Sequence, residues 1–183
     1  MRIIAGELKG RRLKAPDWEG LRPTSDRLRE TLFNVLGPSV AGARVLDGYA
    51  GTGAIGIEAL SRGAAHVTFV EHDRRAVALI EANLQHCGIA SPSTEPRSGP
   101  YAIIPKDFTR FSGDQGFDII VLDPPYGRAA LEAALNAAEK ITSSNTRVII
   151  EHATRDPAPA QAGVLVLRRD LRSGDSALAF YTV

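Results

Sequence analysis

The segment best suited to chemistry is Asp123-Pro124-Pro125-Tyr126, which directly follows an apolar run that begins at Phe117. Two consecutive prolines fix two backbone φ angles and prevent the chain from continuing as a helix. A carboxylate, a main-chain carbonyl and an aromatic ring are therefore held in one rigid corner. A rigid turn after a buried strand would use the same residues, so the tetrapeptide alone leaves both interpretations open.

This corner suits the methylation of an exocyclic amine on a nucleic-acid base. Such an amine is a poor nucleophile because its lone pair is delocalised into the ring. The Asp123 carboxylate and the Pro124 carbonyl can accept its two N–H hydrogens, which favours a pyramidal nitrogen. Tyr126 can stack on the base, a contact worth roughly 1–3 kcal/mol. These three residues are the catalytic candidates, and the target base must be unpaired or flipped out to reach them.

A glycine-rich turn follows the short apolar segment that ends at Asp47 and supplies a candidate cofactor site. Gly51 and Gly53 allow a ligand to approach the backbone closely. With Gly56 they also match G-x-G-x-x-G, so a dinucleotide-binding oxidoreductase is a real alternative. The Asp47 carboxylate would repel a pyrophosphate but would suit the ammonium group of a methionine moiety, which favours S-adenosylmethionine as the cofactor.

Further cofactor candidates lie at the ends of later segments. Glu71 can accept hydrogen bonds from ribose hydroxyls, a feature that NAD enzymes share, and His72 follows it. Asp107 can accept from the adenine amine, with Phe108 packed against the ring, although a surface acid that caps the short segment 108–111 is a close alternative. The predicted cofactor-binding residues are Asp47, Tyr49, Gly51, Thr52, Gly53, Glu71, His72, Asp107, Phe108 and Thr24.

Strands that alternate with helices position these residues. Apolar runs predict strands at 44–47, 66–71, 101–105, 117–123 and 147–151, and periodic segments predict helices at 25–36, 53–62, 74–87 and 129–141. Unbroken apolar strands indicate a mostly parallel sheet that is covered on both faces. Hairpins are predicted at both ends of the chain, from 2–5 and 12–15 and from 164–168 and 177–181, and residues 90–100 are predicted to form a loop.

Composition sets the class of protein without identifying a partner. The 183 residues carry a net charge of +1 and a single cysteine, Cys87, so the balance of charge neither favours nor excludes nucleic acid. No run is long enough to span a bilayer, and we expect a cytoplasmic protein. The four histidines lack metal-ligand spacing, and no metal is expected. We predict one domain over 1–183, with an RNA-binding extension at 1–40 and a catalytic core at 41–183.

Several motifs resemble the RsmD family of 16S rRNA guanine-N2 methyltransferases, in order along nearly the whole chain. They are Met1–Gly6, Gly10–Leu13, Arg22–Thr24, Arg29–Asn34, Leu46–Asp47, Ala50–Ala54, Glu58–Ala64 and Asp123–Tyr126. The resemblance implies a Rossmann-like class I methyltransferase fold with a seven-stranded sheet. It also implies a guanine in small-subunit rRNA, either free or presented on an assembling particle, as the substrate. Gly48 departs from the family because a larger apolar residue is usual there, and Tyr49 and Tyr126 stand where phenylalanine is common.

A cluster of basic residues predicts an RNA surface near the N-terminus, although a solvated charged face would look the same. The candidates are Lys9, Arg11, Arg12, Lys14, Arg22, Arg27 and Arg29. We expect 16S rRNA or an assembling small subunit as the partner, no membrane, and a monomer. One alternative is an adenine-N6 or cytosine-N4 methyltransferase, although such enzymes often have Asn at the position of Asp123. Another is a non-catalytic RNA-binding or assembly protein.

Overall fold

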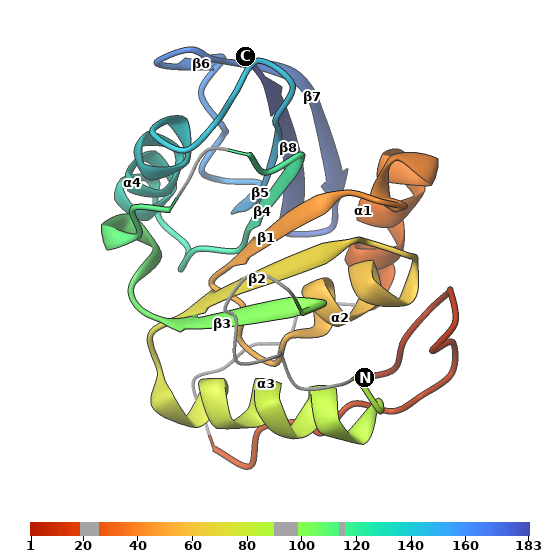
Figure 1. Cartoon of the computed structure of the whole chain (residues 1–183). Coiled ribbons are helices and arrows are strands. Elements are labelled where there is room, and N and C mark those ends of the chain that lie inside the picture. Colours follow the sequence, from red (N-terminus) through yellow and green to blue (C-terminus); the bar gives the residue numbers. More distant parts are fainter. Residues whose placement is uncertain (19–25, 90–98, 114–115) are drawn as a thin grey trace.

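The computed structural model describes residues 1–18, 26–89, 99–113 and 116–183. The helices are α1 (Asp26–Leu36), η1 (Gly37–Val40), α2 (Ala54–Ser61), α3 (Arg74–His86), η2 (Phe108–Arg110) and α4 (Arg128–Glu139). The strands are β1 (Arg44–Gly48), β2 (His66–Glu71), β3 (Tyr101–Pro105), β4 (Ile119–Leu122), β5 (Arg147–Ala153), β6 (Gln161–Ala162), β7 (Leu165–Ser173) and β8 (Ser176–Thr182). Figure 1 shows these elements layered around one twisted sheet.

The strands lie in the order β3-β2-β1-β4-β5-β8-β7-β6. β1 pairs in parallel with both β2 and β4, whereas β8 runs antiparallel to β5 and β7. The predicted parallel sheet with an antiparallel C-terminal hairpin is therefore confirmed, and this is the fold of class I methyltransferases. The predicted number of seven strands is one too few because β6 adds a two-residue edge strand, too short to leave a periodic pattern.

The central strands are buried because side chains from both of their faces enter separate cores. Val45 and Val121 pack with apolar residues of α1, α2 and α3 on one face of the sheet. Leu46 and Leu122 pack with α4 on the other face. This alternation explains why β1 and β4 appear in the sequence as unbroken apolar runs. It leaves the carboxyl ends of these two strands, where the order of connections reverses, as the place for a ligand.

The N-terminal hairpin differs from the prediction. A single bridge joins Arg2 and Arg12, instead of two paired strands. The segment is held by α2, where the buried Glu58 carboxylate accepts from the main-chain N–H groups of Ile4 and Ala5 at 2.7 and 3.0 Å. A Cβ at Gly6, whose φ is +83°, would overlap the Ser61 carbonyl. Tertiary contacts with α2 therefore replace the ladder that the sequence suggests.

The predicted boundaries of β2 and β3 agree with the structure, and the helix that Asp73 caps begins at the expected place, with Asp73 accepting from the Arg75 N–H at 2.8 Å. The C-terminal hairpin is longer than predicted and turns at Gly174-Asp175, because β7 and β8 remain paired to Ser173 and Ser176. The predicted cap of α1 at Thr24 or Ser25, and most of the loop at 90–100, lie outside the described residues.

Candidate active site

The Asp123 corner and the glycine-rich turn meet at the carboxyl ends of β4 and β1. Gly48, the last residue of β1, pairs with Leu122, the last residue of β4. One residue later, the Asp123 N–H donates to the Gly48 carbonyl at 3.4 Å. The structure thus brings the two predicted halves of the site together at adjacent strand ends.

Positive φ angles shape the turn after β1. Gly51 and Gly53 have φ values of 55° and 75°, and Tyr49 adopts 64°. For a tyrosine this conformation costs about 1–3 kcal/mol, a strain typical of functional turns. Gly56, at the third glycine position, lies so close to Phe69 and to Val67 of β2 that a Cβ would overlap their side chains. Its role is therefore to let α2 pack closely against the sheet.

The carboxylates of Glu71 and Asp123 act on the buried carboxyl group of Asp47 beside this turn. Asp47 is 2% exposed, and its Oδ2 accepts from the Gly56 N–H at 2.8 Å. Burial raises the pKa of Asp47 well above its usual range, and the charges of Asp123 and Glu71 raise it further, against the Gly56 hydrogen bond. A cationic ligand would relieve this repulsion and a pyrophosphate would increase it. This group of acidic side chains therefore fits the positively charged ammonium and sulfonium groups of S-adenosylmethionine.

Glu71 ends β2 beside the turn and is buried. Its Oε2 accepts from the Gly51 N–H and its Oε1 from the Asp73 N–H, both at 2.8 Å. His72 is mostly exposed, and its Nδ1 lies 3.2 Å from Glu71 Oε1. The Glu71 carboxylate thus fixes the cofactor turn, and Oε2, which accepts from the Gly51 N–H, retains a second lone pair for a ribose hydroxyl.

Phe108 fills the space that the side chain missing at Gly48 leaves. A Cβ on Gly48 would lie 2.9 Å from the Phe108 ring and 2.6 Å from Leu122. The Phe108 ring is 2% exposed and lies 5.5 Å from the Tyr49 ring. The prediction that Phe108 packs against adenine is therefore wrong for this conformation, because the buried ring leaves no face for a ligand. Burial also raises the pKa of Tyr49 to about 12.

Asp107 caps the short helix η2, as the alternative interpretation proposed. Its Oδ1 accepts from the N–H and the hydroxyl of Thr109 at 2.8 and 2.7 Å. These hydrogen bonds lower the pKa of Asp107, and the fields of His72 and Arg110 add to the effect. The side chain remains exposed. A role towards adenine would have to use this capping carboxylate, which is ionised at neutral pH.

Tyr126 projects from the proline corner and is 37% exposed. Its hydroxyl lies 2.7 Å from the Ser176 hydroxyl and donates to Glu151 Oε1 at 3.3 Å. Glu151 belongs to β5 and Ser176 to β8, so the antiparallel hairpin helps to fix the ring. Asp123 is half-buried, and Pro124 beside it is buried. The corner therefore presents an aromatic ring and a carboxylate on a rigid frame.

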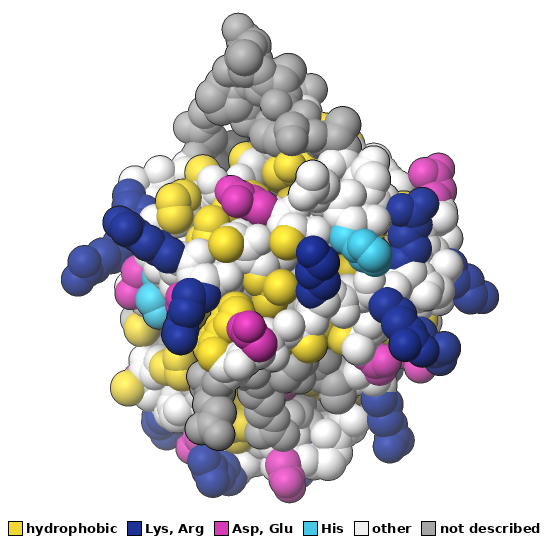
Figure 2. Space-filling view, turned by 90° about the horizontal axis from the view of Figure 1, so that it is seen from below, with side chains coloured by type: hydrophobic (Ala, Val, Ile, Leu, Met, Phe, Trp, Pro, Cys, Tyr) yellow, Lys and Arg dark blue, Asp and Glu magenta, His cyan; other side chains and the backbone are white. Residues whose placement is uncertain are grey.

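The predicted RNA residues separate into three groups. Those on the surface are Lys9, Arg11, Arg12, Lys14 and Arg27. Figure 2 shows the face of the molecule that is seen from below, with Lys and Arg side chains gathered towards its two sides. Arg11 also donates to the Cys87 carbonyl at the end of α3, at 2.8 Å. Arg22 and the cofactor candidate Thr24 lie outside the described residues.

The prediction that Arg29 contacts RNA is wrong. Its side chain is 0% exposed, and Nη2 donates to Asp26 Oδ1 at 2.9 Å and to the Arg2 carbonyl at 2.7 Å. Burial lowers the pKa of Arg29, while the charges of Asp26 and Glu58 oppose that shift. Arg29 therefore joins α1 to the N-terminal segment, a role that a count of basic residues does not distinguish from phosphate binding.

Sequence reasoning missed Asn83, a polar residue on the apolar face of α3. It is 0% exposed and lies between the buried residues Ile80 and Leu84. Its side chain binds the main chain of Lys14 and the carbonyl of Thr52, the central residue of the cofactor turn. The available signal was a carboxamide at a position where the helical period requires an apolar side chain.

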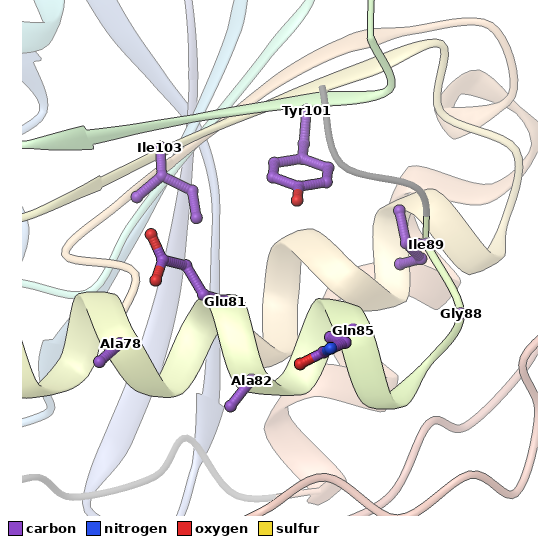
Figure 3. Close-up of a pocket in the computed structure, with 8 residues that line it drawn as sticks. All are labelled: Ala78, Glu81, Ala82, Gln85, Gly88, Ile89, Tyr101 and Ile103. Carbon is purple, nitrogen blue, oxygen red and sulfur yellow. The ribbon is translucent and has the colours of Figure 1, made fainter. Parts of the chain in front are cut away.

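A hollow lies at the β3 edge of the molecule, and its lining includes none of the predicted site residues. Its lining comes from α3, from Gly88 and Ile89 after that helix, and from Tyr101 and Ile103 of β3 (Figure 3). In the described parts of the chain, no three His, Cys, Asp or Glu side chains are grouped to hold a metal. No helix in those parts is long and apolar enough to cross a membrane.

Comparisons with known proteins agree with the fold and the motifs. A family model described as "Conserved hypothetical protein 95" matches residues 1–182. Ribosomal RNA small subunit methyltransferase D of Escherichia coli K12 is 35% identical over 185 residues, covering 99% of this chain and 89% of that protein.

Two further relatives differ in how much they share. The solved structure of Escherichia coli yhhF has a TM-score of 0.83 and 34% identity, covering 100% of this chain and 97% of that one. A tRNA (guanine(10)-N2)-dimethyltransferase of Methanothermobacter thermautotrophicus is 37% identical over 109 residues, which are 60% of this chain and 29% of that protein. Because the family model and the first relative both span nearly the whole chain, this protein belongs to the family of ribosomal RNA small subunit methyltransferase D.

Proposed function

We propose that this protein transfers a methyl group from S-adenosylmethionine to the exocyclic N2 amine of a guanine in 16S ribosomal RNA. The observation that carries the proposal is the position of Asp123, one residue beyond the Gly48–Leu122 pair and beside the cofactor turn. The relative from Escherichia coli is named for methylation of small-subunit rRNA, and the archaeal relative is named for methylation of a guanine N2 in tRNA. The first name supports small-subunit rRNA as the substrate, and the second supports the N2 amine of a guanine as the target.

Residues of the turn are suited to hold the cofactor, which supplies an electrophilic methyl group on a positively charged sulfur. Asp47 offers a buried negative charge to its cationic end, and Glu71 offers oxygens for ribose hydroxyls. Gly51 and Gly53 leave the backbone open to close approach. Tyr49, Thr52, His72 and Asp107 border this region and remain candidates for the rest of the contact.

The Asp123 corner is suited to orient and activate the amine. The Asp123 carboxylate and the Pro124 carbonyl would accept its N–H hydrogens, stabilise the charge on nitrogen as the bond forms, and provide an acceptor for the proton that is lost. Tyr126 would stack on the guanine, with its ring fixed through Ser176 and Glu151. Fixing both reactants in line can contribute up to about 7–11 kcal/mol to lowering the barrier.

The N-terminal residues 1–40 would bind RNA, while residues 41–183 form the catalytic core. Exposed Lys9, Arg11, Arg12 and Lys14 offer phosphate contacts close to α3, and Arg27 offers one on α1. We further infer that the substrate is an assembling small subunit in the cytoplasm and that the protein acts as a monomer. A splayed-out base is required, because the corner cannot reach into a stacked helix.

The test is the transfer of a tritiated methyl group to small-subunit RNA and to particles that lack the modification, followed by mass analysis of the nucleosides. The expected product is N2-methylguanosine. Recovery of N6-methyladenosine or N4-methylcytosine would support the alternative methyltransferases instead. Binding of NAD in place of S-adenosylmethionine in calorimetry would support an oxidoreductase, and cofactor binding without transfer to any RNA would support a non-catalytic protein.

A further inference from the structure

One buried side chain joins the N-terminal segment to the cofactor turn. Asn83 Oδ1 accepts from the Lys14 N–H at 2.7 Å, and its Nδ2 donates to the Lys14 carbonyl at 3.3 Å and to the Thr52 carbonyl at 3.0 Å. Figure 1 shows the N-terminal segment running along α3, the helix that carries Asn83. Lys14 and Thr52, which are 69 and 31 residues from Asn83 along the chain, are therefore both bound by its carboxamide.

These contacts require the chemistry of asparagine. One side of the carboxamide faces a donor and the other faces two acceptors, so only one orientation of the group satisfies all three contacts. The side chain is 0% exposed, and water cannot easily replace a lost partner. A shorter hydroxyl or an apolar residue at this position would break the connection on at least one side.

At the Thr52 end of the connection, the Asn83 carboxamide donates to a main-chain carbonyl that none of the other described contacts of the turn uses. The neighbouring Gly51 and Gly53 have positive φ angles and a wide choice of conformation. The other main-chain hydrogen bonds at this turn bind other peptide groups. The Gly51 N–H donates to Glu71 at 2.8 Å and the Gly53 N–H to the Ala50 carbonyl at 2.7 Å, while the Ala50 N–H donates to Val70 at 3.1 Å and the Gly53 carbonyl accepts from Ile57 at 2.9 Å. The direction of the Thr52 carbonyl therefore depends on Asn83, and with it the path of the backbone that faces the cofactor.

The Lys14 end lies in the basic segment. Lys14 and Arg12 are exposed on either side of the buried Leu13, so a phosphate bound by their side chains would act directly on the residue that Asn83 holds. Movement of this segment and movement of the cofactor turn thus share one hydrogen-bonded group. Two sites that bias one structural element are coupled, and the coupling acts equally in both directions.

We propose that Asn83 is a positioning residue that couples cofactor binding at the turn to RNA binding at the N-terminal segment. The RNA half of this inference rests on the proposed function, whereas the link between the turn and Lys14 does not. Cofactor binding should order the turn and, through Asn83, the main chain at Lys14. RNA should then bind more tightly to the protein that already holds cofactor.

The first test uses wild-type protein and S-adenosylhomocysteine, with amide hydrogen exchange followed by NMR. The Lys14 amide, which donates to Asn83, is expected to exchange more slowly when the ligand is bound. The matched control is the Gly10 amide of the same segment, which donates to the Ile3 carbonyl at 2.9 Å and is expected to stay unchanged. Equal exchange at Lys14 with and without ligand would overturn the coupling, although methylation of rRNA could still be observed.

The second test compares the affinity for unmodified small-subunit particles with and without S-adenosylhomocysteine. In the wild-type protein, S-adenosylhomocysteine is expected to raise the affinity for particles about 5- to 150-fold, the usual range for coupled sites. In Asn83→Ala the gain should vanish, whereas in Lys14→Ala, which keeps the main-chain contacts, affinity should fall and the gain remain. An unchanged gain in Asn83→Ala, or no gain in wild type, would contradict the proposal. Absence of any methyl transfer despite a protected Lys14 amide would instead overturn the proposed function alone.

Discussion

The Asp123 N–H donates to the Gly48 carbonyl at 3.4 Å, so the proline corner and the cofactor turn are held by adjacent ends of two parallel strands. This contact is made by the main chain and does not depend on either side chain. Substitutions at Asp123 therefore change the chemistry at these strand ends and leave their main-chain frame intact. The same geometry explains why the charge of Asp123 raises the pKa of Asp47.

Replacing Asp123 with Ala should lower kcat about 100- to 1,000-fold, the usual loss when one group that stabilises developing charge is removed. Asp123→Asn keeps one carbonyl acceptor, so its kcat should fall less than that of Asp123→Ala. Methyl transfer to small-subunit particles measures both variants. Affinity for S-adenosylhomocysteine, whose sulfur is uncharged, should not change, and full activity in Asp123→Ala would remove this residue from the mechanism.

Asp47→Asn should stabilise the free protein near neutral pH and weaken cofactor binding. The folded protein raises the pKa of Asp47, so its contribution to stability is present below the unfolded pKa of about 3.9 and is lost as pH rises through the folded pKa. Asparagine avoids that loss and can still accept from Gly56. Thermal unfolding of both proteins from pH 4 to 8 should show a difference that grows with pH. A constant difference would mean that Asp47 does not titrate in this range.

Gly48→Ala should destabilise the protein by about 1–3 kcal/mol, because its Cβ would enter space that Phe108 and Leu122 occupy. In a chain of this size the melting temperature would fall by about 2–4 °C for each kcal/mol. The control is the double variant with Phe108→Leu, in which the smaller side chain should reduce the cost of the added methyl. If the double variant lost as much stability as the two single variants together, Phe108 would not be the residue that fills this space.

The positions of the central strands, and of the acidic residues that follow them, could be predicted from the sequence because buried parallel strands leave a local apolar signal. An acid or glycine after an apolar run, as at Asp47, Glu71 and Asp123, can be read without knowing the partner strand. The roles of Arg29 and Phe108 could not be read this way, because burial depends on residues far along the chain. Asn83 was missed for the same reason, since both of its partners come from other segments.

Arg29→Met should lower the stability of the protein and leave its RNA affinity unchanged. Arg27→Ala should lower RNA affinity and leave stability almost unchanged. Both residues lie on α1, but Arg29 is buried against Asp26 and the Arg2 carbonyl, and Arg27 is exposed. Losing hydrogen bonds to a charged group costs about 1.5–3 kcal/mol, while an exposed substitution usually changes stability by less than about 0.5 kcal/mol. Unfolding and RNA-binding titrations at a temperature well below melting separate the two effects.

Arg12→Ala and Lys14→Ala should weaken RNA binding through lost phosphate contacts, and their double variant should reduce the dependence on salt. Each lost contact should lower the slope of log K against log salt concentration by about 0.7–0.9. Arg11→Ala should also lower the melting temperature, because Arg11 holds the Cys87 carbonyl at the end of α3. Binding titrations between 50 and 200 mM salt, the range over which such contacts act strongly, measure the slope. If the double variant keeps the wild-type slope while Arg27→Ala reduces it, RNA crosses α1 and not the N-terminal segment.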